Sequence, residues 1–131
     1  MGRTVLCVDD DPDDRDLIRS AIFDIDPSYT IAYAENGRDA LKYLKDSLNA
    51  ELPCLIIMDI NMPVMDGKQT IAEIKKWPEL DHVPLVVFST SNHPSDLSFC
   101  KRYNVELVMK PTSLRQITQE AQRLLHHCAE D

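Results

Sequence analysis

The sequence has 131 residues, and its 44% of apolar side chains is enough for one closed core, so we expect a single domain over residues 1–131 with no output domain. Acidic residues outnumber basic ones by 22 to 14, a formal net charge of -8, and the basic residues form no run, which argues against nucleic acid and anionic membrane as main partners. No apolar stretch approaches the length of a membrane span and the N-terminus lacks a signal-peptide core, so we expect a cytoplasmic location.

Short apolar or β-branched runs alternate along the chain with amphipathic segments. The short runs predict strands, whereas apolar residues that recur at helical spacing predict helices. In chain order we expect a strand at 4–8, a helix at 12–26, a strand at 29–34, a helix at 37–48, a strand at 55–58, a helix at 67–77, a strand at 85–88, a helix at 95–103, a strand at 105–109 and a helix at 114–125.

Polar residues mark where the helices begin and end. Three of them are expected as N-caps, namely Asp11, Asp66 and Ser113, and Asn36-Gly37 is expected to open the second helix. Gln116, three residues after Ser113, completes a capping box. Asn104 suits the left-handed position that follows a helix. For Asp11 and Asp66, capping is favoured over metal binding.

Five alternations of strand and helix predict an α/β domain with a doubly wound five-stranded parallel sheet and helices on both faces, because parallel strands need right-handed crossovers. In the flavodoxin-like strand order 2-1-3-4-5, the first and third strands are neighbours. Ligands of such sheets bind beyond the carboxyl ends of the strands, where the strand order reverses.

Polar side chains follow four of the five expected strands. Asp9 and Asp10 follow the first strand, Asp59 the third, Ser89 the fourth and Lys110 the fifth. Carboxylates about 4 Å apart repel by roughly 4 kcal/mol per pair at an effective dielectric constant near 20, so three of them in one crevice call for a cation or an unusual proton, and a divalent ion is the simpler answer. Mg²⁺ suits hard oxygen ligands and keeps coordination positions for a phosphate oxygen.

The same edge carries the remaining parts of a phosphoryl-transfer site. Lys110 supplies a charge and the Ser89 hydroxyl a hydrogen-bond donor for phosphate oxygens. A third carboxylate is available as nucleophile, because an unperturbed aspartate is ionised at neutral pH. The constellation therefore predicts phosphoryl transfer onto an aspartate.

In these motifs the chain resembles a receiver domain of bacterial two-component response regulators, of the stand-alone chemotaxis or phytochrome-associated kind. The resemblance covers the acidic pair in Val8-Asp9-Asp10-Asp11, the D-x-x-M-P-x-x-D-G run that begins at Asp59, and Lys110-Pro111.

The resemblance implies that Asp59 is phosphorylated from a phosphohistidine on a sensor kinase. It implies a metal site of Asp9, Asp10, Asp59 and the backbone carbonyl of Asn61. It makes Ser89 the switch hydroxyl and Lys110 the group that holds the phosphoryl. Asn61 and Ser91 fall where the family tunes the lifetime of the aspartyl phosphate.

One position departs from the family. Three residues before the lysine, receivers often carry an aromatic residue that follows the switch hydroxyl, and here that residue is Leu107. A signal would then have to pass through the fourth strand, the fourth helix and the fifth strand by packing.

We expect a switch that is not an enzyme beyond its own phosphoryl transfer and dephosphorylation, with a sensor histidine kinase and a downstream protein as partners. A relay that passes phosphate to a histidine carrier and a phosphorylation-independent interaction module stay open, as does a homodimer. A phosphohydrolase of the haloacid-dehalogenase type is disfavoured, because it needs an acid where this chain has Asn61.

Two further groups of residues receive structural interpretations. Asp13 and Asp14 are expected in a solvated first turn that suits the helix dipole. Four cysteines are expected as small buried thiols rather than as a disulfide or metal site: Cys7, Cys54, Cys100 and Cys128.

Overall fold

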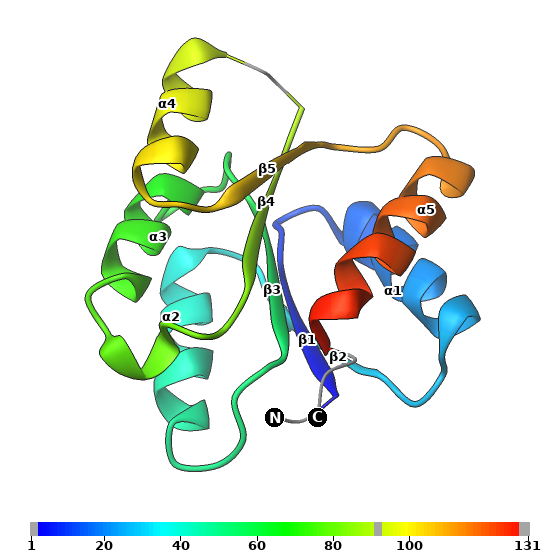
Figure 1. The fold of residues 1–131 in the computed structure, drawn as a ribbon, viewed down its shortest axis with the longest axis horizontal. Helices are drawn as coiled ribbons and strands as arrows, with labels where there is room; N and C mark the ends of the chain where they lie inside the picture. The colour runs from blue at the N-terminus through cyan, green and yellow to red at the C-terminus, as the bar shows by residue number, and fades with distance from the viewer. Residues whose placement is uncertain (1–2, 91–92, 129–131) are drawn as a thin grey trace.

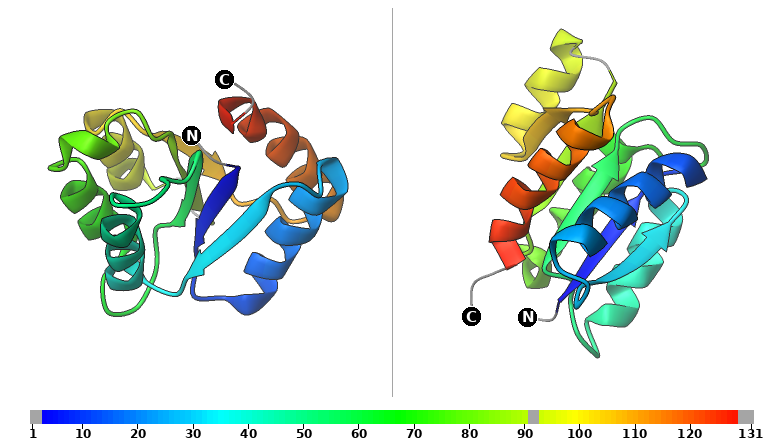
Figure 2. Two further views of the ribbon diagram at one scale, coloured as in Figure 1. Left: turned by 90° about the horizontal axis from the view of Figure 1, so that it is seen from below. Right: turned by 90° about the vertical axis from the view of Figure 1, so that its right-hand side faces the viewer.

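A computed structural model describes residues 3–90 and 93–128 (Figures 1 and 2). The five strands are β1 (Thr4–Val8), β2 (Thr30–Ala34), β3 (Leu55–Asp59), β4 (Leu85–Ser89) and β5 (Glu106–Met109). The five helices are α1 (Pro12–Ile25), α2 (Gly37–Ser47), α3 (Gly67–Ile74), α4 (Pro94–Arg102) and α5 (Leu114–Leu124). Two short 3-10 helices span Pro78–Leu80 and Leu125–Cys128.

The strands form one parallel sheet in the order β2-β1-β3-β4-β5. Helices α1 and α5 cover one face, and α2, α3 and α4 cover the other (Figure 1). The predicted doubly wound sheet and its strand order are confirmed. Because β1 and β3 are neighbours, their carboxyl ends lie side by side.

Each face of the sheet has its own apolar core. Strands β1, β3 and β4 are buried almost throughout, which explains why they read as continuous apolar runs rather than alternating ones. Leu6, Leu55, Ile56 and Met58 are fully buried. Each such side chain contributes about 1.5–3 kcal/mol through removal of apolar surface from water, so these strands form a rigid base for the residues that follow them.

The expected caps are in place. The side chains of Asp11, Asn36, Asp66 and Ser113 each accept a hydrogen bond from a backbone N–H of the first turn. Asn104 has a φ of 55°, as its position after α4 required. The capping box at α5 is only half formed, because the Gln116 side chain accepts from the Thr112 N–H instead of from Ser113.

The prediction that the third helix reaches Trp77 was wrong. Helix α3 ends at Ile74, and Trp77 has extended backbone angles, φ -102° and ψ 104°, before the 3-10 helix Pro78–Leu80. The proline explains the difference, since its ring disfavours the helical conformation in the residue before it.

The prediction of four free thiols was wrong for two of them. Cys54, just before β3, forms a disulfide with Cys128 of the C-terminal 3-10 helix, and their Cα atoms are 5.1 Å apart. The two residues are 74 positions apart in the sequence, so only the crossover that brings the chain end back beside β3 makes them neighbours. Cys7 and Cys100 are free and buried, as expected.

Within residues 3–90 and 93–128, no helix combines the length and the apolar character that crossing a membrane requires.

Candidate functional site

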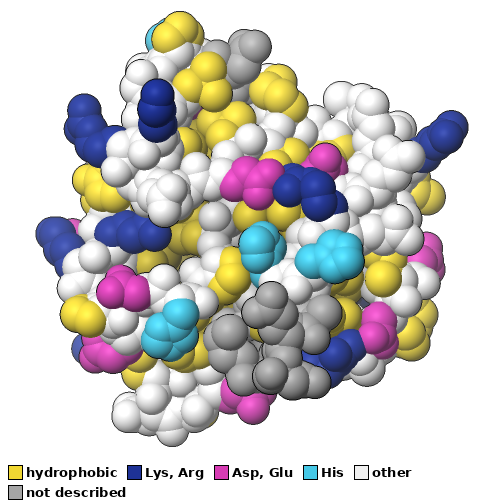
Figure 3. Space-filling view, viewed as in Figure 1, with side chains coloured by type: hydrophobic (Ala, Val, Ile, Leu, Met, Phe, Trp, Pro, Cys, Tyr) yellow, Lys and Arg dark blue, Asp and Glu magenta, His cyan; other side chains and the backbone are white. Residues whose placement is uncertain are grey.

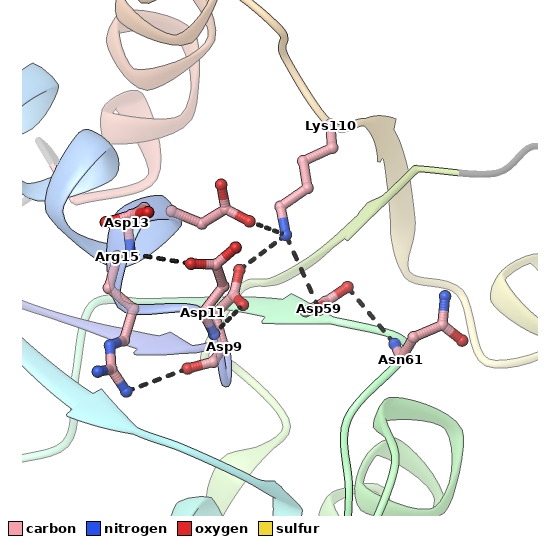
Figure 4. A network of polar contacts seen from close by, with 8 residues as sticks. Asp9, Asp11, Asp13, Arg15, Asp59, Asn61 and Lys110 are labelled. Atoms are coloured by element: carbon pink, nitrogen blue, oxygen red, sulfur yellow. Dashed lines mark hydrogen bonds and ion pairs between the residues drawn. The ribbon is translucent and has the colours of Figure 1, made fainter.

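The polar residues predicted to meet at one edge of the sheet do so. Asp9 follows β1, Asp59 and Ser89 are the last residues of β3 and β4, and Lys110 follows β5. Figure 4 shows the Lys110 side chain reaching across the strand ends towards Asp9 and Asp59. The backbone holds this arrangement, since the Lys110 N–H donates to the Ser89 carbonyl oxygen at 2.7 Å.

Three carboxylates surround the Lys110 ammonium group. Its Nζ atom lies 2.6 Å from Asp14 Oδ2, 2.9 Å from Asp9 Oδ2 and 3.8 Å from Asp59 Oδ2. Lys110 is therefore a shared counter-ion rather than the partner of one acid. The nearest two carboxylates leave Asp59 with the weakest of the three contacts.

Asp14 was placed wrongly by the sequence, which indicated a solvated first turn. In the structure its carboxylate makes the shortest of the Lys110 contacts. One feature of the sequence could have indicated this contact. Asp14 lies in the first turn of α1, soon after the strand end that carries Asp9 and Asp10. A charge in that turn serves the helix dipole whether it faces water or the site, so the sequence pattern alone did not distinguish the two.

Asp9, Asp10 and Asp59 form the one group of three or more acidic, histidine or cysteine side chains that could hold a metal ion in the part of the chain that the structure describes. One carboxylate oxygen from each of them lies within 4.8 Å of the others. Asp9 and Asp59 are buried, whereas Asp10 is exposed and leaves the cluster open to solvent. This all-oxygen donor set suits a hard divalent cation.

Burial and crowding of negative charge shift the pKa values in this cluster. Burial raises the pKa of Asp59 to about 6, with the charges of Asp9 and Asp10 adding to the rise and the charge of Lys110 opposing it. The pKa of Asp9 is also raised, mainly by burial. Burial acts to lower the pKa of Lys110, but its hydrogen bonds to Asp14 and Asp9 outweigh that effect and raise it. Lys110 therefore stays positively charged, and the carboxylates around it carry more negative charge than this one ammonium group can neutralise.

Gly67 brings the start of α3 against the end of β3. A Cβ atom at this position would lie 2.7 Å from the Asp59 carbonyl oxygen and 2.8 Å from the Ile60 Cα atom, both of them backbone atoms. The Gly67 N–H donates to the Ile60 carbonyl oxygen at 2.8 Å, which closes the loop after Asp59. The D-G pair at the end of the motif thus fixes the backbone that carries Asp59.

The remaining residues predicted for the site are Asn61, Ser89, Ser91 and Leu107. The Asn61 N–H donates to Asp59 Oδ1 over 3.4 Å, and its side chain points away from Asp59 (Figure 4). Ser89 is fully buried at the end of β4. Ser91 lies outside the described residues. Leu107 is half-buried and packs with the core beneath α2, α3 and α4.

Arg15 contacts the acidic cluster, which the sequence did not suggest. Its guanidinium Nη1 donates to the Asp9 carbonyl oxygen at 3.2 Å and lies 3.8 Å from Glu35 Oε1 at the end of β2. This side chain of α1 therefore connects the outer strand β2 with the backbone of the acidic cluster.

Comparisons with known proteins agree with this geometry. The family model for the response regulator receiver domain matches residues 5–122. Response regulator Rcp1 of Synechocystis sp. is 30% identical over 98 residues, which are 72% of this chain and 67% of that protein. The crystal structure of the phosphorylated cyanobacterial phytochrome response regulator RcpA is similar with a TM-score of 0.86 at 29% identity, over 96% of this chain and 93% of that chain. The Mn²⁺-bound form of Rcp1 is similar with a TM-score of 0.83 at 25% identity, over 98% and 96%.

Proposed function

This chain belongs to the response regulator receiver domain family of two-component systems, and from that premise we propose that it is a phosphorylation-dependent switch in which Asp59 accepts a phosphoryl group from a sensor histidine kinase. The observation that carries the proposal is the arrangement at the strand ends. Asp59 belongs to a carboxylate cluster that can hold a cation, and its Oδ2 atom lies 3.8 Å from the charged Nζ of Lys110. The similar RcpA structure is of a phosphorylated protein and the similar Rcp1 structure contains Mn²⁺, which supports both parts of the proposal.

The metal fits the residues present. Asp9, Asp10 and Asp59 would hold Mg²⁺ with the Asn61 backbone carbonyl, and the all-oxygen donor set matches what this ion prefers. When bound, the ion would offset the negative charge of the cluster and of the incoming phosphoryl oxygens.

Asp59 is the nucleophile of the transfer. A carboxylate oxygen forms a bond to phosphorus while the bond between phosphorus and the histidine nitrogen breaks, and the electron pair leaves with that nitrogen. Only the ionised form of Asp59 can attack. With its pKa raised to about 6, most of Asp59 is ionised at pH 7.5 even before a cation binds.

Lys110 and Ser89 position the phosphoryl group. The Nζ atom of Lys110 is already 3.8 Å from Asp59 Oδ2 and donates to phosphoryl oxygens once it turns from Asp14. The Ser89 hydroxyl, at the end of the neighbouring strand, is the second donor. Both groups act on charge that appears only when Asp59 carries phosphate, which is how the modified state differs from the unmodified one.

The test is incubation of the chain with Mg²⁺ and acetyl phosphate, followed by intact-mass measurement. We expect a single phosphoryl adduct, which Asp59→Asn and EDTA abolish. Asp81→Asn, an exposed aspartate beside the 3-10 helix Pro78–Leu80, is the matched control and should keep the adduct. An adduct that persists in Asp59→Asn, or no adduct in the unaltered chain, would refute the proposal.

A further inference from the structure

The outer strand β2 is an unprotected edge of the sheet. It pairs with β1 on one side, and the described residues place no strand on the other (Figure 2, right, cyan). Its five residues, Thr-Ile-Ala-Tyr-Ala, contain no charged side chain and no proline. Those are the features with which natural proteins block the pairing of exposed edges.

The opposite edge differs. Strand β5 begins with Glu106, whose carboxylate lies 2.7 Å from Arg123 of α5, and Arg123 also contacts Glu120 at 2.7 Å. Side chains of both charge signs lie together on the β5 and α5 side of the molecule (Figure 3). Of the two edge strands, only β2 has no charged residue within the strand itself, although Arg15 and Glu35 lie beside its end.

The direction of the β2 backbone groups defines what can pair with it. The Thr30 N–H donates to Arg3 O, and Ala34 O accepts from Asp9 N–H, so these groups point towards β1. Because successive residues of a strand alternate, the N–H and C=O groups of Ile31 and Tyr33 point outwards. The edge therefore offers two donors and two acceptors, placed symmetrically about Ala32.

We propose that a second copy of this chain pairs with β2 in antiparallel orientation, with the two-fold axis at Ala32. Ile31 of each copy then exchanges both backbone hydrogen bonds with Tyr33 of the other, and the two Ala32 residues face each other as a non-hydrogen-bonded pair. The small Ala32 side chain permits that approach. The sheets of the two copies become one continuous sheet.

The α1 side of β2 is self-complementary in this register. Tyr33 lies on that side, since Arg15 of α1 stacks over its ring at 5.6 Å, and the residue is 41% exposed. Beside Ile31, on the same side, is a surface hollow of about 270 Å³ lined by Arg19, Phe23, Pro27, Tyr29, Thr30 and Ile31. Opposed residues of antiparallel strands point to the same face, so Tyr33 of each copy enters the hollow of the other.

Charge also matches across the pair. The same register sets Glu35 opposite Tyr29, whose ring carries the guanidinium of Arg3 at 4.2 Å. That guanidinium also pairs with Asp26 of its own chain, so Glu35 of the second copy would be its second carboxylate partner. Glu35 is 73% exposed, and its contact with Arg15 is long at 3.8 Å. Antiparallel pairing thus brings an exposed carboxylate to a guanidinium at both ends of the edge, whereas parallel pairing would bring like charges together.

The first test is the solution mass of the full chain by sedimentation at rising concentration. The interface is small, so the average mass should rise towards twice the monomer between about 10 µM and about 1 mM. Tyr33→Lys removes this rise, and Met109→Lys, a matched change of an exposed apolar residue on the other edge strand, keeps it. A chain that is monomeric throughout, or a dimer lost in Met109→Lys and kept in Tyr33→Lys, overturns the proposal.

The second test reads the register by cross-linking. Ala32→Cys places two thiols across the axis, where Cα atoms of such a pair are about 4.5 Å apart and a disulfide can form. Thr30→Cys is the control, because the two Thr30 residues would be about 14 Å apart, four residue rises along the strands. We expect disulfide-linked dimer only in Ala32→Cys, above the background of the unaltered chain, whose free thiols Cys7 and Cys100 are buried. Equal cross-linking of both variants, or none in Ala32→Cys, excludes this register.

Discussion

Replacing Asp59 by asparagine should stabilise the metal-free protein at alkaline pH. Asp59 is buried at the end of β3 beside the carboxylates of Asp9 and Asp10, and its pKa is raised from 3.8 to about 6. A shift of about two units corresponds to about 3 kcal/mol by which folding disfavours the ionised form. Asparagine has nearly the same shape and cannot ionise. Its amide N–H groups cost about 1 kcal/mol where they lack a partner, which leaves a gain of about 2 kcal/mol.

The pH dependence separates this effect from a change in packing. Because the pKa of Asp59 is raised on folding, protonation favours the folded state below the unfolded value of 3.8, and that contribution is lost as the pH rises through about 6. The gain from Asp59→Asn should therefore be about 2 kcal/mol at pH 8 and close to zero at pH 4.5.

The assay is urea denaturation in EDTA at both pH values, with unfolding monitored by circular dichroism. The exposed Asp81→Asn serves as control. Saturating Mg²⁺ should reduce the gain, because the chain that keeps Asp59 has one more charged ligand and is stabilised more by the bound cation than the variant is. A variant that is no more stable than the unaltered chain at pH 8, or a gain that is the same at both pH values, would refute the reasoning.

Three further outcomes follow from the site geometry. Asp14→Asn removes the carboxylate 2.6 Å from Lys110 Nζ, and a half-exposed pair of this kind is worth about 1 kcal/mol, so beryllofluoride should bind about fivefold more tightly by fluorescence titration. Gly67→Ala forces a Cβ atom into the backbone of Asp59, which should lower the free energy of unfolding by about 1–3 kcal/mol and slow phosphorylation measured by intact mass. Val64 has a φ of 67° in the exposed loop after Asp59, so Val64→Gly should raise the free energy of unfolding in urea by about 0.5–1 kcal/mol.

The first two of these variants each have a neighbouring residue that serves as control. Asp13→Asn changes the same helical turn as Asp14→Asn, and it should leave beryllofluoride affinity unchanged. Lys68→Ala, one residue after Gly67, adds no atom near Asp59 and should not slow phosphorylation. Beryllofluoride affinity that does not respond to Asp14→Asn, or phosphorylation in Gly67→Ala as fast as in the unaltered chain, would show that these contacts do not govern access to Asp59.

The sheet and the site could be predicted because they depend on short sequence patterns, each of which has a single structural interpretation. A run such as Leu55–Met58 is apolar throughout and too short for a helix, so its burial on both faces follows from the residues alone. A parallel sheet then brings every carboxyl end to the same edge. The meeting of Asp9, Asp59 and Lys110 is a consequence of topology, and no contact between these distant residues had to be inferred separately.

What could not be predicted depends on distances between side chains. Cys54 and Cys128 resemble buried thiols in their local sequence, and only the return of α5 to the start of β3 makes them partners. Asp13 and Asp14 are adjacent aspartates in the same helical turn, so their local sequences are alike. The rotation of one residue along the helix nevertheless turns the Asp14 side chain towards Lys110. Patterns of hydrophobicity fix which face of an element is buried, but they do not record the few ångströms that decide which carboxylate a lysine contacts.

If Asp59 is phosphorylated as proposed, the charge balance of the site supplies a route by which the phosphoryl group would act as a switch despite Leu107. Without phosphate, Lys110 is held mainly by Asp14 and Asp9, which ties the residue after β5 to the first turn of α1. A phosphoryl group on Asp59 adds negative charge on the other side of the same ammonium group, and Lys110 cannot serve both equally. Its transfer from Asp14 to the phosphate would loosen α1 from the end of β5 and pull that end towards β3. This movement needs no aromatic side chain at position 107, since it begins in the lysine that directly follows β5 and reaches β4 through the backbone hydrogen bond from Lys110 N–H to the Ser89 carbonyl oxygen.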